Sequence, residues 1–236
     1  MAKIKVDTVY QRVLAIANKE QRGYITPQEF NLLANQAQLA IFDQYFYDIS
    51  QISTLPGNET EYADMLKTLN EKISIFKKLD TSLTKSGSFF LYPNDMYKLG
   101  TLYFAQSGGL SEDGVEIQEV NYDELLDILR SPLTAPTKSH PIYIRRKEGI
   151  KIFSTPAITS GVIASYIRRP NDVEWGYVVV NGEALYNASA SNNFELHLSE
   201  ENLLVMKILE LAGIVINKPG LITVGQQEQN EIQQKK

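Results

Sequence analysis

The sequence predicts an α+β protein in which both ends of the chain form a helical body and an antiparallel, β-rich domain is inserted between them. Apolar residues recur at helical spacing through the first 80 residues and again near the C-terminal end. Short β-branched and aromatic runs, separated by Gly, Pro and Asn, occupy the middle of the chain. We therefore expect three parts: a helical part over residues 1–80, a β-rich domain with one short helix over 81–198, and a returning helix with a polar tail over 199–236.

The first two helices have clear start signals. Apolar residues mark one face of the first helix over residues 6–17, with Asp7 placed to cap its N-terminus and Gly23 just past its end. The second helix begins at Thr26-Pro27-Gln28-Glu29, a capping box with Pro at the first helical position. Its apolar face continues for about five turns, to Tyr45.

The remaining elements follow from periodicity and from turn residues. A third helix is expected over residues 62–76, a short one over 121–130 that stops before Pro132, and a C-terminal one over 199–217. Seven runs have the composition of strands: residues 88–92, 99–105, 114–120, 141–145, 150–154, 162–167 and 173–180.

Composition excludes several classes of protein. Hydrophobic residues make up 43% of the chain and charged residues 22%, which is typical of a folded globular chain. Cysteine is absent, which excludes disulfides, thiolate metal sites and a cysteine nucleophile. The N-terminal residues lack the apolar core of a secretory signal, and no run of about 18 apolar residues occurs, so we expect cytosolic synthesis and no membrane partner.

The net charge of -5 conceals two neighbouring segments of opposite sign. Between Leu110 and Pro136, seven acidic residues are opposed only by Arg130. Between Ser139 and Arg169, Glu148 alone opposes the basic residues, which are Arg145, Arg146, Lys147, Lys151, Arg168 and Arg169. The segments could pair within one chain, or the acidic side of one subunit could meet the basic side of the next. The basic residues could also contact nucleic-acid phosphate.

We find no catalytic, metal or cofactor motif. Nucleophile-elbow, Walker A, zinc-protease and dinucleotide-binding patterns are all absent from the sequence. His140 and His197 are the two histidines of the chain and lie far apart in the sequence with no cysteine near either, so we interpret both as structural or surface residues. We therefore expect a protein that is not an enzyme and needs no cofactor.

Two alternatives to a purely structural role remain open at this point. A hydrolase in the β-rich domain would need converging carboxylates, which the sequence does not identify. A β-rich carbohydrate- or surface-binding module would expose aromatic residues near its loops, and Trp175, Tyr177 and Tyr186 are the candidates.

The end of the second helix is rich in aromatic residues. Phe42, Tyr45, Phe46 and Tyr47 occupy more than one face of this helix, which a single core contact would not require. A thick core contact explains them equally well, but large and fairly rigid aromatic side chains are also favoured between subunits. We take these four residues as candidates for a subunit interface.

The same region carries a family resemblance. Residues 17–31, ANKEQRGYITPQEFN, continue through NQAQ at 35–38 to FDQYF at 42–46. This segment resembles the start of neck proteins from short-tailed bacteriophages, and it is most similar to the ring proteins of crAss-like phages. The likeness is looser in the last helix, over residues 203–216, and the β-rich region between carries none.

The resemblance implies a structural virion protein of the head-to-tail connector, or neck. In such an adaptor, about twelve identical subunits form a closed ring beneath the portal and surround the channel that carries DNA. The implied partners are further copies of the chain, the portal, other neck or tail proteins, and genomic DNA in non-specific contact. The implied location is the virion, with assembly in the cytoplasm of the bacterial host.

Overall fold

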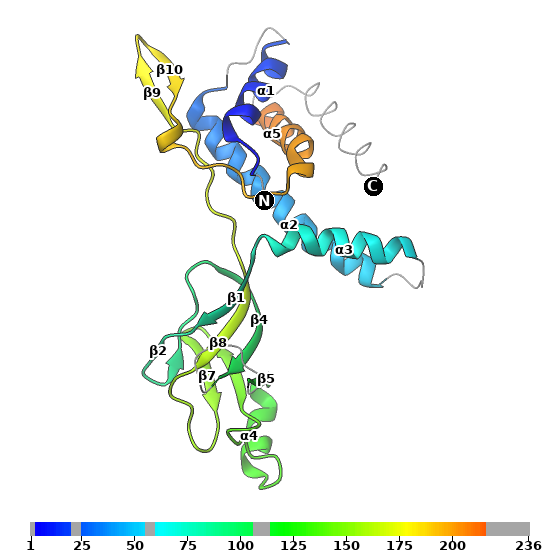
Figure 1. Ribbon diagram of the computed structural model, residues 1–236, viewed down its shortest axis with the longest axis vertical. Coiled ribbons are helices and arrows are strands. Elements are labelled where there is room, and N and C mark those ends of the chain that lie inside the picture. The colour runs from blue at the N-terminus through cyan, green and yellow to red at the C-terminus, as the bar shows by residue number, and fades with distance from the viewer. Residues whose placement is uncertain (1–2, 20–24, 55–59, 106–113, 216–236) are drawn as a thin grey trace. The chain divides into compact units, whose positions relative to one another are not determined.

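The computed structural model describes residues 3–19, 25–54, 60–105 and 114–215. Over this part the chain forms five α-helices, a large curled sheet of eight strands and a separate two-stranded hairpin (Figure 1). The predicted mixture of helices with an antiparallel-rich sheet is therefore confirmed. The chain divides into two compact units: unit 1 contains residues 1–75 and 170–236, and unit 2 contains residues 76–169.

Unit 1 contains four helices: α1 (Val6–Lys19), α2 (Pro27–Thr54), α3 (Thr60–Ser74) and α5 (Glu201–Val215). Helix α5 packs against both α1 and α2, and α3 packs against α2. The helices bury apolar side chains from both ends of the chain, among them Val9, Val13, Phe30, Phe42, Leu204 and Ile208. These side chains form the core of unit 1, whereas Met65 on the predicted apolar face of α3 is exposed.

The start of α2 has the predicted capping box. The Thr26 amide donates to Glu29 Oε2 at 2.9 Å, and the Glu29 amide donates back to Thr26 Oγ1 at 3.3 Å. Each side chain thereby satisfies an amide that the first turn leaves without a helical acceptor.

The start of α1 differs from the prediction. The helix begins at Val6, so Asp7 lies inside its first turn, and the Val6 amide donates to Asn193 Oδ1 at 3.0 Å. Asp7 Oδ1 instead accepts a hydrogen bond from Trp175 Nε1 at 3.0 Å. An asparagine distant in sequence therefore performs the capping role. Gly23 and the polar tail lie outside the described residues.

Unit 2 is built on the eight-stranded sheet. Its strands are β1 (Lys77–Ser82), β2 (Lys85–Ser86), β3 (Phe89–Phe90), β4 (Met96–Phe104), β5 (Val115–Glu119), β6 (Ile142–Arg146), β7 (Gly149–Phe153) and β8 (Val162–Arg168). The order is β1-β8-β4-β5-β6-β7-β3-β2. All neighbours are antiparallel except β5 and β6, whose parallel pairing requires a crossover, and helix α4 (Tyr122–Arg130) lies in that connection.

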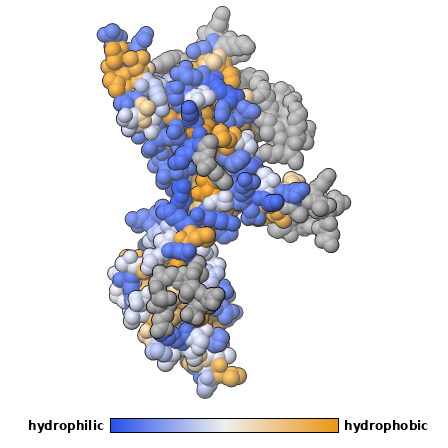
Figure 2. Space-filling model, in the orientation of Figure 1, coloured by the Kyte–Doolittle hydropathy of each residue, from blue (hydrophilic) through white to orange (hydrophobic). Residues whose placement is uncertain are grey.

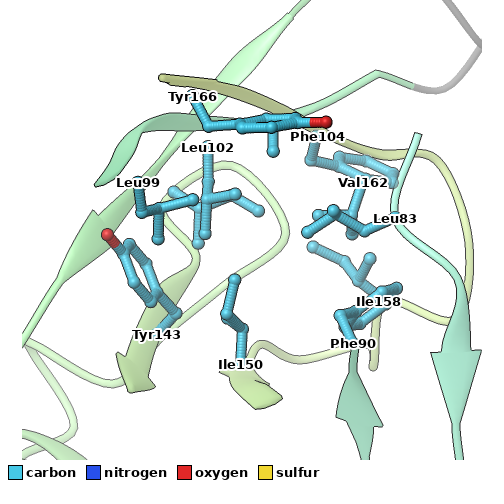
Figure 3. Close-up of a cluster of buried hydrophobic side chains, with 12 residues drawn as sticks. Leu83, Phe90, Leu99, Leu102, Phe104, Tyr143, Ile150, Ile158, Val162 and Tyr166 are labelled. Carbon is cyan, nitrogen blue, oxygen red and sulfur yellow. The ribbon is translucent and has the colours of Figure 1, made fainter. Parts of the chain in front are cut away.

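The curled sheet encloses the core of unit 2. Figure 3 shows side chains from several strands converging on the interior, with Tyr166 beside Leu102 and Phe104 beside Val162. All four side chains are buried, and Phe90 and Ile150 from the opposite end of the strand order join the same cluster. Inward-facing residues of these strands produce this apolar cluster, and a second, smaller one lies between α4 and β6.

One close approach between strands requires glycine. Gly149 at the start of β7 has φ +143°, and a Cβ at this position would lie 2.4 Å from the carbonyl oxygen of Phe90 on β3. A larger residue would therefore separate β7 from β3, which are paired at Phe90 and Ile150.

The end of the inserted domain lies earlier than predicted. We expected the β-rich domain to extend to residue 198, but residues 170–198 belong to unit 1. The strand expected over 173–180 is also shorter, because only β9 (Tyr177–Val180) forms, paired with β10 (Glu183–Tyr186). Residues 171–175 instead form hydrogen bonds with side chains of α2, as described below.

Candidate assembly surface

The hairpin formed by β9 and β10 is the most apolar exposed element of unit 1. Asn181 and Gly182 join the strands, with φ angles of +54° and +87°. Two successive residues in the left-handed region make a turn whose twist matches that of paired strands. The register places Val180 opposite Glu183 and continues to the base of the hairpin.

Apolar side chains occupy both faces of this hairpin. On one face Val178, Val180 and Leu185 are 49%, 46% and 51% exposed. Val179, on the opposite face, is also exposed. Figure 2 shows the hairpin as a concentrated hydrophobic feature of the surface. A hairpin in water normally has a polar face, so exposed apolar side chains on both faces of this hairpin are unusual.

Aromatic residues fix the base of the hairpin. The Trp175 ring stacks on that of Tyr177 at 5.9 Å and lies 5.7 Å from that of Tyr186. It also lies 4.4 Å from the ring of Tyr10 on α1. Trp175 is only 2% exposed, so it is an anchor for the hairpin and not an exposed ligand-binding side chain.

The outer edges of the hairpin are unpaired within the described part of the chain, since β9 and β10 pair only with each other. Each edge presents backbone amides and carbonyls that a further strand can bind. A two-stranded sheet alone is marginally stable in water. A strand from a partner could pair with one of these edges, whereas burial of the valines would need a partner surface against a face of the hairpin.

Three amides on α2 hold the segment that leads to the hairpin. Asn35 donates to the Val173 carbonyl at 2.9 Å and accepts from the Val173 amide at 2.7 Å. Asn31 Oδ1 accepts from the Trp175 amide at 2.8 Å, and Gln38 donates to the Asn171 carbonyl at 2.8 Å. These amides occur at i, i+4 and i+7, on one face of the helix.

This amide clamp gives a structural role to residues that carry the family resemblance. Asn31, Asn35 and Gln38 all belong to the segments quoted above. Gln38 is buried, and its Oε1 accepts a further bond from the Glu195 amide at 3.1 Å. No local pattern marks the clamp, because its backbone partners lie more than 130 residues away in the sequence.

The predicted aromatic interface is only partly at the surface. Phe42 is fully buried and Tyr45 is 3% exposed, so both belong to the core of unit 1 and neither is available to a neighbouring subunit. Phe46 is half-buried and packs edge-on to Phe42 at 5.1 Å. Tyr47 is exposed, and its hydroxyl accepts from Gln51 at 2.6 Å. Thus Tyr47, with part of Phe46, remains as an interface candidate.

A buried ion pair lies close to Tyr45. Lys72 on α3 bonds Glu200 at the start of the last helical segment, and both side chains are buried. The Lys72 ammonium lies 5.8 Å from the centre of the Tyr45 ring. Burial, followed by the nearby carboxylate of Glu200, raises the pKa of Tyr45 well above its ordinary value. Sequence analysis missed this pair because no local pattern marks a lysine as buried.

Part of the basic segment lies at the turn between β6 and β7. Arg145 Nε lies 2.6 Å from Glu119 Oε1, which supports pairing of the acidic and basic segments within one chain at this point. Arg146 packs over the ring of Tyr122, and Lys147 is exposed.

The other candidates of the basic segment lie elsewhere in unit 2. Lys151 packs over the ring of Phe153 on its own strand. Arg168 at the end of β8 packs over the ring of Phe76, and Arg169 is exposed next to it. The predicted set therefore occupies separate strands, and the described contacts do not join it into one group.

Neither histidine has metal-ligand geometry. His197 Nδ1 accepts from the Ser199 amide at 3.2 Å and caps the short helical turn before α5, while His140 is exposed. Residues 3–19, 25–54, 60–105 and 114–215 contain no group of three His, Cys, Asp or Glu residues that could hold a metal ion. No helix in the described part is both long and apolar enough to span a bilayer.

No protein-family model matches the chain, and no curated protein matches it significantly. The geometry above is therefore the basis of the functional argument, together with the resemblance of the N-terminal segment.

Proposed function

We propose that this protein is a structural, non-enzymatic subunit that assembles with copies of itself into a closed ring in the neck of a tailed phage, around the DNA channel. The observation that carries the proposal is the β9–β10 hairpin, a rigidly anchored element with apolar side chains on both faces and unpaired edges. Such an element fits burial against another protein chain better than exposure to water.

The resemblance supplies the particular assembly. It links the segment around Thr26 to ring proteins beneath a portal, and the amide clamp shows how part of that segment acts within the subunit. In this proposal, helices from both chain ends form the body of the ring subunit, and the inserted β-rich domain projects toward a partner. The partners are about twelve copies of the chain, the portal and other neck proteins.

The alternative of a carbohydrate- or surface-binding module has less support. That function needs exposed aromatic rings to stack on a ligand. Of the three candidates, Trp175 is enclosed between other aromatic side chains and Tyr177 is half-buried, so only Tyr186, which is 40% exposed, is accessible. Basic residues such as Arg169 and Lys147 remain exposed for non-specific contact with DNA phosphate in the channel.

The role of the hairpin is tested with the full-length chain. A triple variant, Val178→Thr, Val180→Thr and Leu185→Thr, keeps β-forming residues while it removes the apolar face. We expect light scattering after size-exclusion chromatography to show an oligomer for the wild-type protein and a smaller species for the variant. Leu32→Gln is the matched control, because Leu32 is an exposed apolar residue on α2.

Two outcomes would contradict parts of this proposal. A wild-type protein that stays monomeric at high concentration, with and without its portal, excludes the ring. Identical oligomers for wild type and triple variant would show that the hairpin is not the contact.

A further inference from the structure

The tip of the β9–β10 hairpin carries the one asparagine of the sequence that is followed by glycine, Asn181 before Gly182. Both residues are exposed, and a Cβ at Gly182 would meet no atom within 4 Å. In the described part of the chain, neither the Asn181 side chain nor the Gly182 N–H takes part in a hydrogen bond. The side-chain amide and the backbone nitrogen that follows it are therefore both accessible to water.

An asparagine side chain can react with the backbone nitrogen of the next residue. Attack of that nitrogen on Cγ closes a five-membered succinimide ring. The reaction is fastest when the next residue is glycine, because no Cβ obstructs the approach. Every other asparagine of this sequence precedes a residue that has a Cβ.

Hydrogen bonds restrain several of the other asparagine side chains in unit 1. Asn187, just after β10, accepts from the Ser189 amide at 3.1 Å, and Asn193 accepts from the Val6 amide at 3.0 Å. The asparagines of the amide clamp are held in the same way by the segment that leads to the hairpin. Asn181 has no such restraint, and the sequence and the structure therefore single out the same residue.

We propose that Asn181 is a site of spontaneous deamidation and that its isoaspartyl product opens the β9–β10 hairpin. The Gly182 nitrogen forms a bond to Asn181 Cγ, the Cγ–Nδ2 bond breaks, and Nδ2 leaves as ammonia with the proton that the Gly182 nitrogen gives up. Water then hydrolyses the succinimide. Cleavage of the new N–Cγ bond gives aspartate, whereas cleavage of the original peptide bond gives isoaspartate, whose main chain runs through Cβ and Cγ.

The stability of the turn controls the rate of this reaction. Asn181 and Gly182 have φ angles of +54° and +87° in the paired hairpin, and the backbone around Cγ is free to rearrange only when the tip opens. The hairpin has two strands, which pair only with each other in the described part of the chain. Local opening of such an element costs less free energy than unfolding of unit 1, so the reaction proceeds in the folded protein.

An isoaspartyl residue does not fit the two-residue turn. Val180 lies opposite Glu183, a spacing that two residues with ordinary backbones span. Isoaspartate adds one carbon to the main chain between them and places a carboxylate next to the exposed, apolar Val180. The aspartate product keeps the ordinary backbone, and Asp-Gly is itself a favoured pair for this turn. The isoaspartyl product is therefore the one that opens the hairpin.

The consequence for assembly rests on the proposed function. In a ring that covers the hairpin, opening of the tip is restricted, so an assembled subunit should deamidate more slowly than a free one. A free subunit that forms isoaspartate loses the proposed contact before it can assemble. The reaction would thus remove old, unassembled subunits from the pool.

Peptide mapping of the full-length protein after incubation at mildly alkaline pH tests the reaction. Glutamyl endopeptidase cleaves after Glu174 and Glu183 and releases residues 175–183. Replacement of the amide by a carboxyl group makes this peptide about 1 Da heavier, and labelling by isoaspartyl methyltransferase identifies the isoaspartyl form. Asn121 is the internal control, because it is exposed, its side chain caps no amide, and it precedes Tyr122. Deamidation should be about tenfold or more faster at Asn181.

Tryptophan fluorescence measures the opening of the hairpin. The Trp175 ring stacks on Tyr177 and lies near Tyr186, so loss of strand pairing should expose it and shift its emission to longer wavelength. Asn181→Gly is the matched control, because Gly-Gly also fits the turn and has no side chain to react. After incubation this variant should show neither the mass change nor the shift. Freshly purified Asn181→Asp should emit like fresh wild-type protein.

The outcomes separate the inference from the proposed function. Deamidation that is no faster at Asn181 than at Asn121 overturns the inference and leaves the ring untouched. Isoaspartate at this position without a change in emission overturns the opening of the hairpin. If the wild type is oligomeric, isoaspartate should be enriched in the smaller species after size-exclusion chromatography, and equal amounts in both species would overturn the loss of contact. A monomeric wild type that still forms isoaspartate overturns the proposed function but supports the modification site.

Discussion

Replacement of Lys72 by methionine should strongly destabilise unit 1, because it leaves the buried carboxylate of Glu200 without its ammonium partner. Both side chains are almost fully enclosed, and Met preserves most of the volume of Lys. Removal of one partner from a buried ion pair typically costs about 3–5 kcal/mol, chiefly because the remaining charge stays desolvated. For a protein of this size that corresponds to a decrease in Tm of roughly 6–20 °C.

The double variant, Lys72→Met with Glu200→Leu, separates this effect from simple packing. Replacement of both charged groups by apolar ones of similar volume is often neutral, so we expect it to recover most of the lost free energy of unfolding. The difference between the single and double variants measures the cost of the isolated charge.

Tryptophan fluorescence is a selective assay for this comparison. The sequence contains one tryptophan, Trp175, and it lies buried in unit 1. Urea unfolding followed by fluorescence therefore reports unit 1 even if unit 2 unfolds separately. A loss below about 1 kcal/mol in the single variant, or a double variant as unstable as the single one, would refute the reasoning.

Three further changes test particular contacts. Tyr45→Phe removes a buried hydroxyl that has no hydrogen-bond partner in the described part of the chain, so unit 1 should be unchanged or up to about 1 kcal/mol more stable by the same fluorescence assay. The raised pKa of Tyr45 means that wild-type stability is complete below about pH 10 and falls above it, and the variant should lose less. Thr26→Ala removes the capping box with Glu29 and should cost about 1 kcal/mol in urea unfolding. Gly149→Ala should cost more than about 1 kcal/mol in thermal unfolding followed by circular dichroism, because its Cβ meets the Phe90 carbonyl, and no change would contradict the geometry.

Local signals in the sequence were sufficient for most elements. The capping box at Thr26 marks the start of α2, and the stop before Pro132 marks the end of α4. These signals, like the apolar periodicity of the C-terminal segment, depend on neighbouring residues, and α2, α4 and α5 form where they occur. Strands also form within the predicted runs, because β-branched runs between turn residues are a local pattern, although the runs over 88–92 and 173–180 form only the shorter strands β3 and β9.

Elements with weak local signals were missed. Strand β1 is rich in lysine and contains Asp80 with a positive φ, which conceals its pairing with β8. The Asn181-Gly182 pair is a strong hairpin signal, and it could have identified β10 and the turn. The run over 173–180 was read as one strand because nothing local shows that Val173 and Trp175 bind asparagines of α2.

The candidate sites depended on burial, which the sequence determines only indirectly. Phe42 and Tyr45 were grouped with Tyr47 because all are aromatic, but two of the three face the core. Trp175 was a candidate for an exposed aromatic residue in the binding-module alternative, but it is buried and anchors the hairpin. Tyr122, Leu126 and Leu129 of α4 have the spacing of a core face, and only the structure shows that another face of the same helix, with Leu125, already fills that role.

Electron microscopy of the purified full-length protein tests the central claim most directly. Class averages should show closed rings with rotational symmetry and an open central channel, formed by the wild-type chain alone or on addition of its portal. A population of single, asymmetric particles under both conditions would contradict the account, whatever the behaviour of the individual variants.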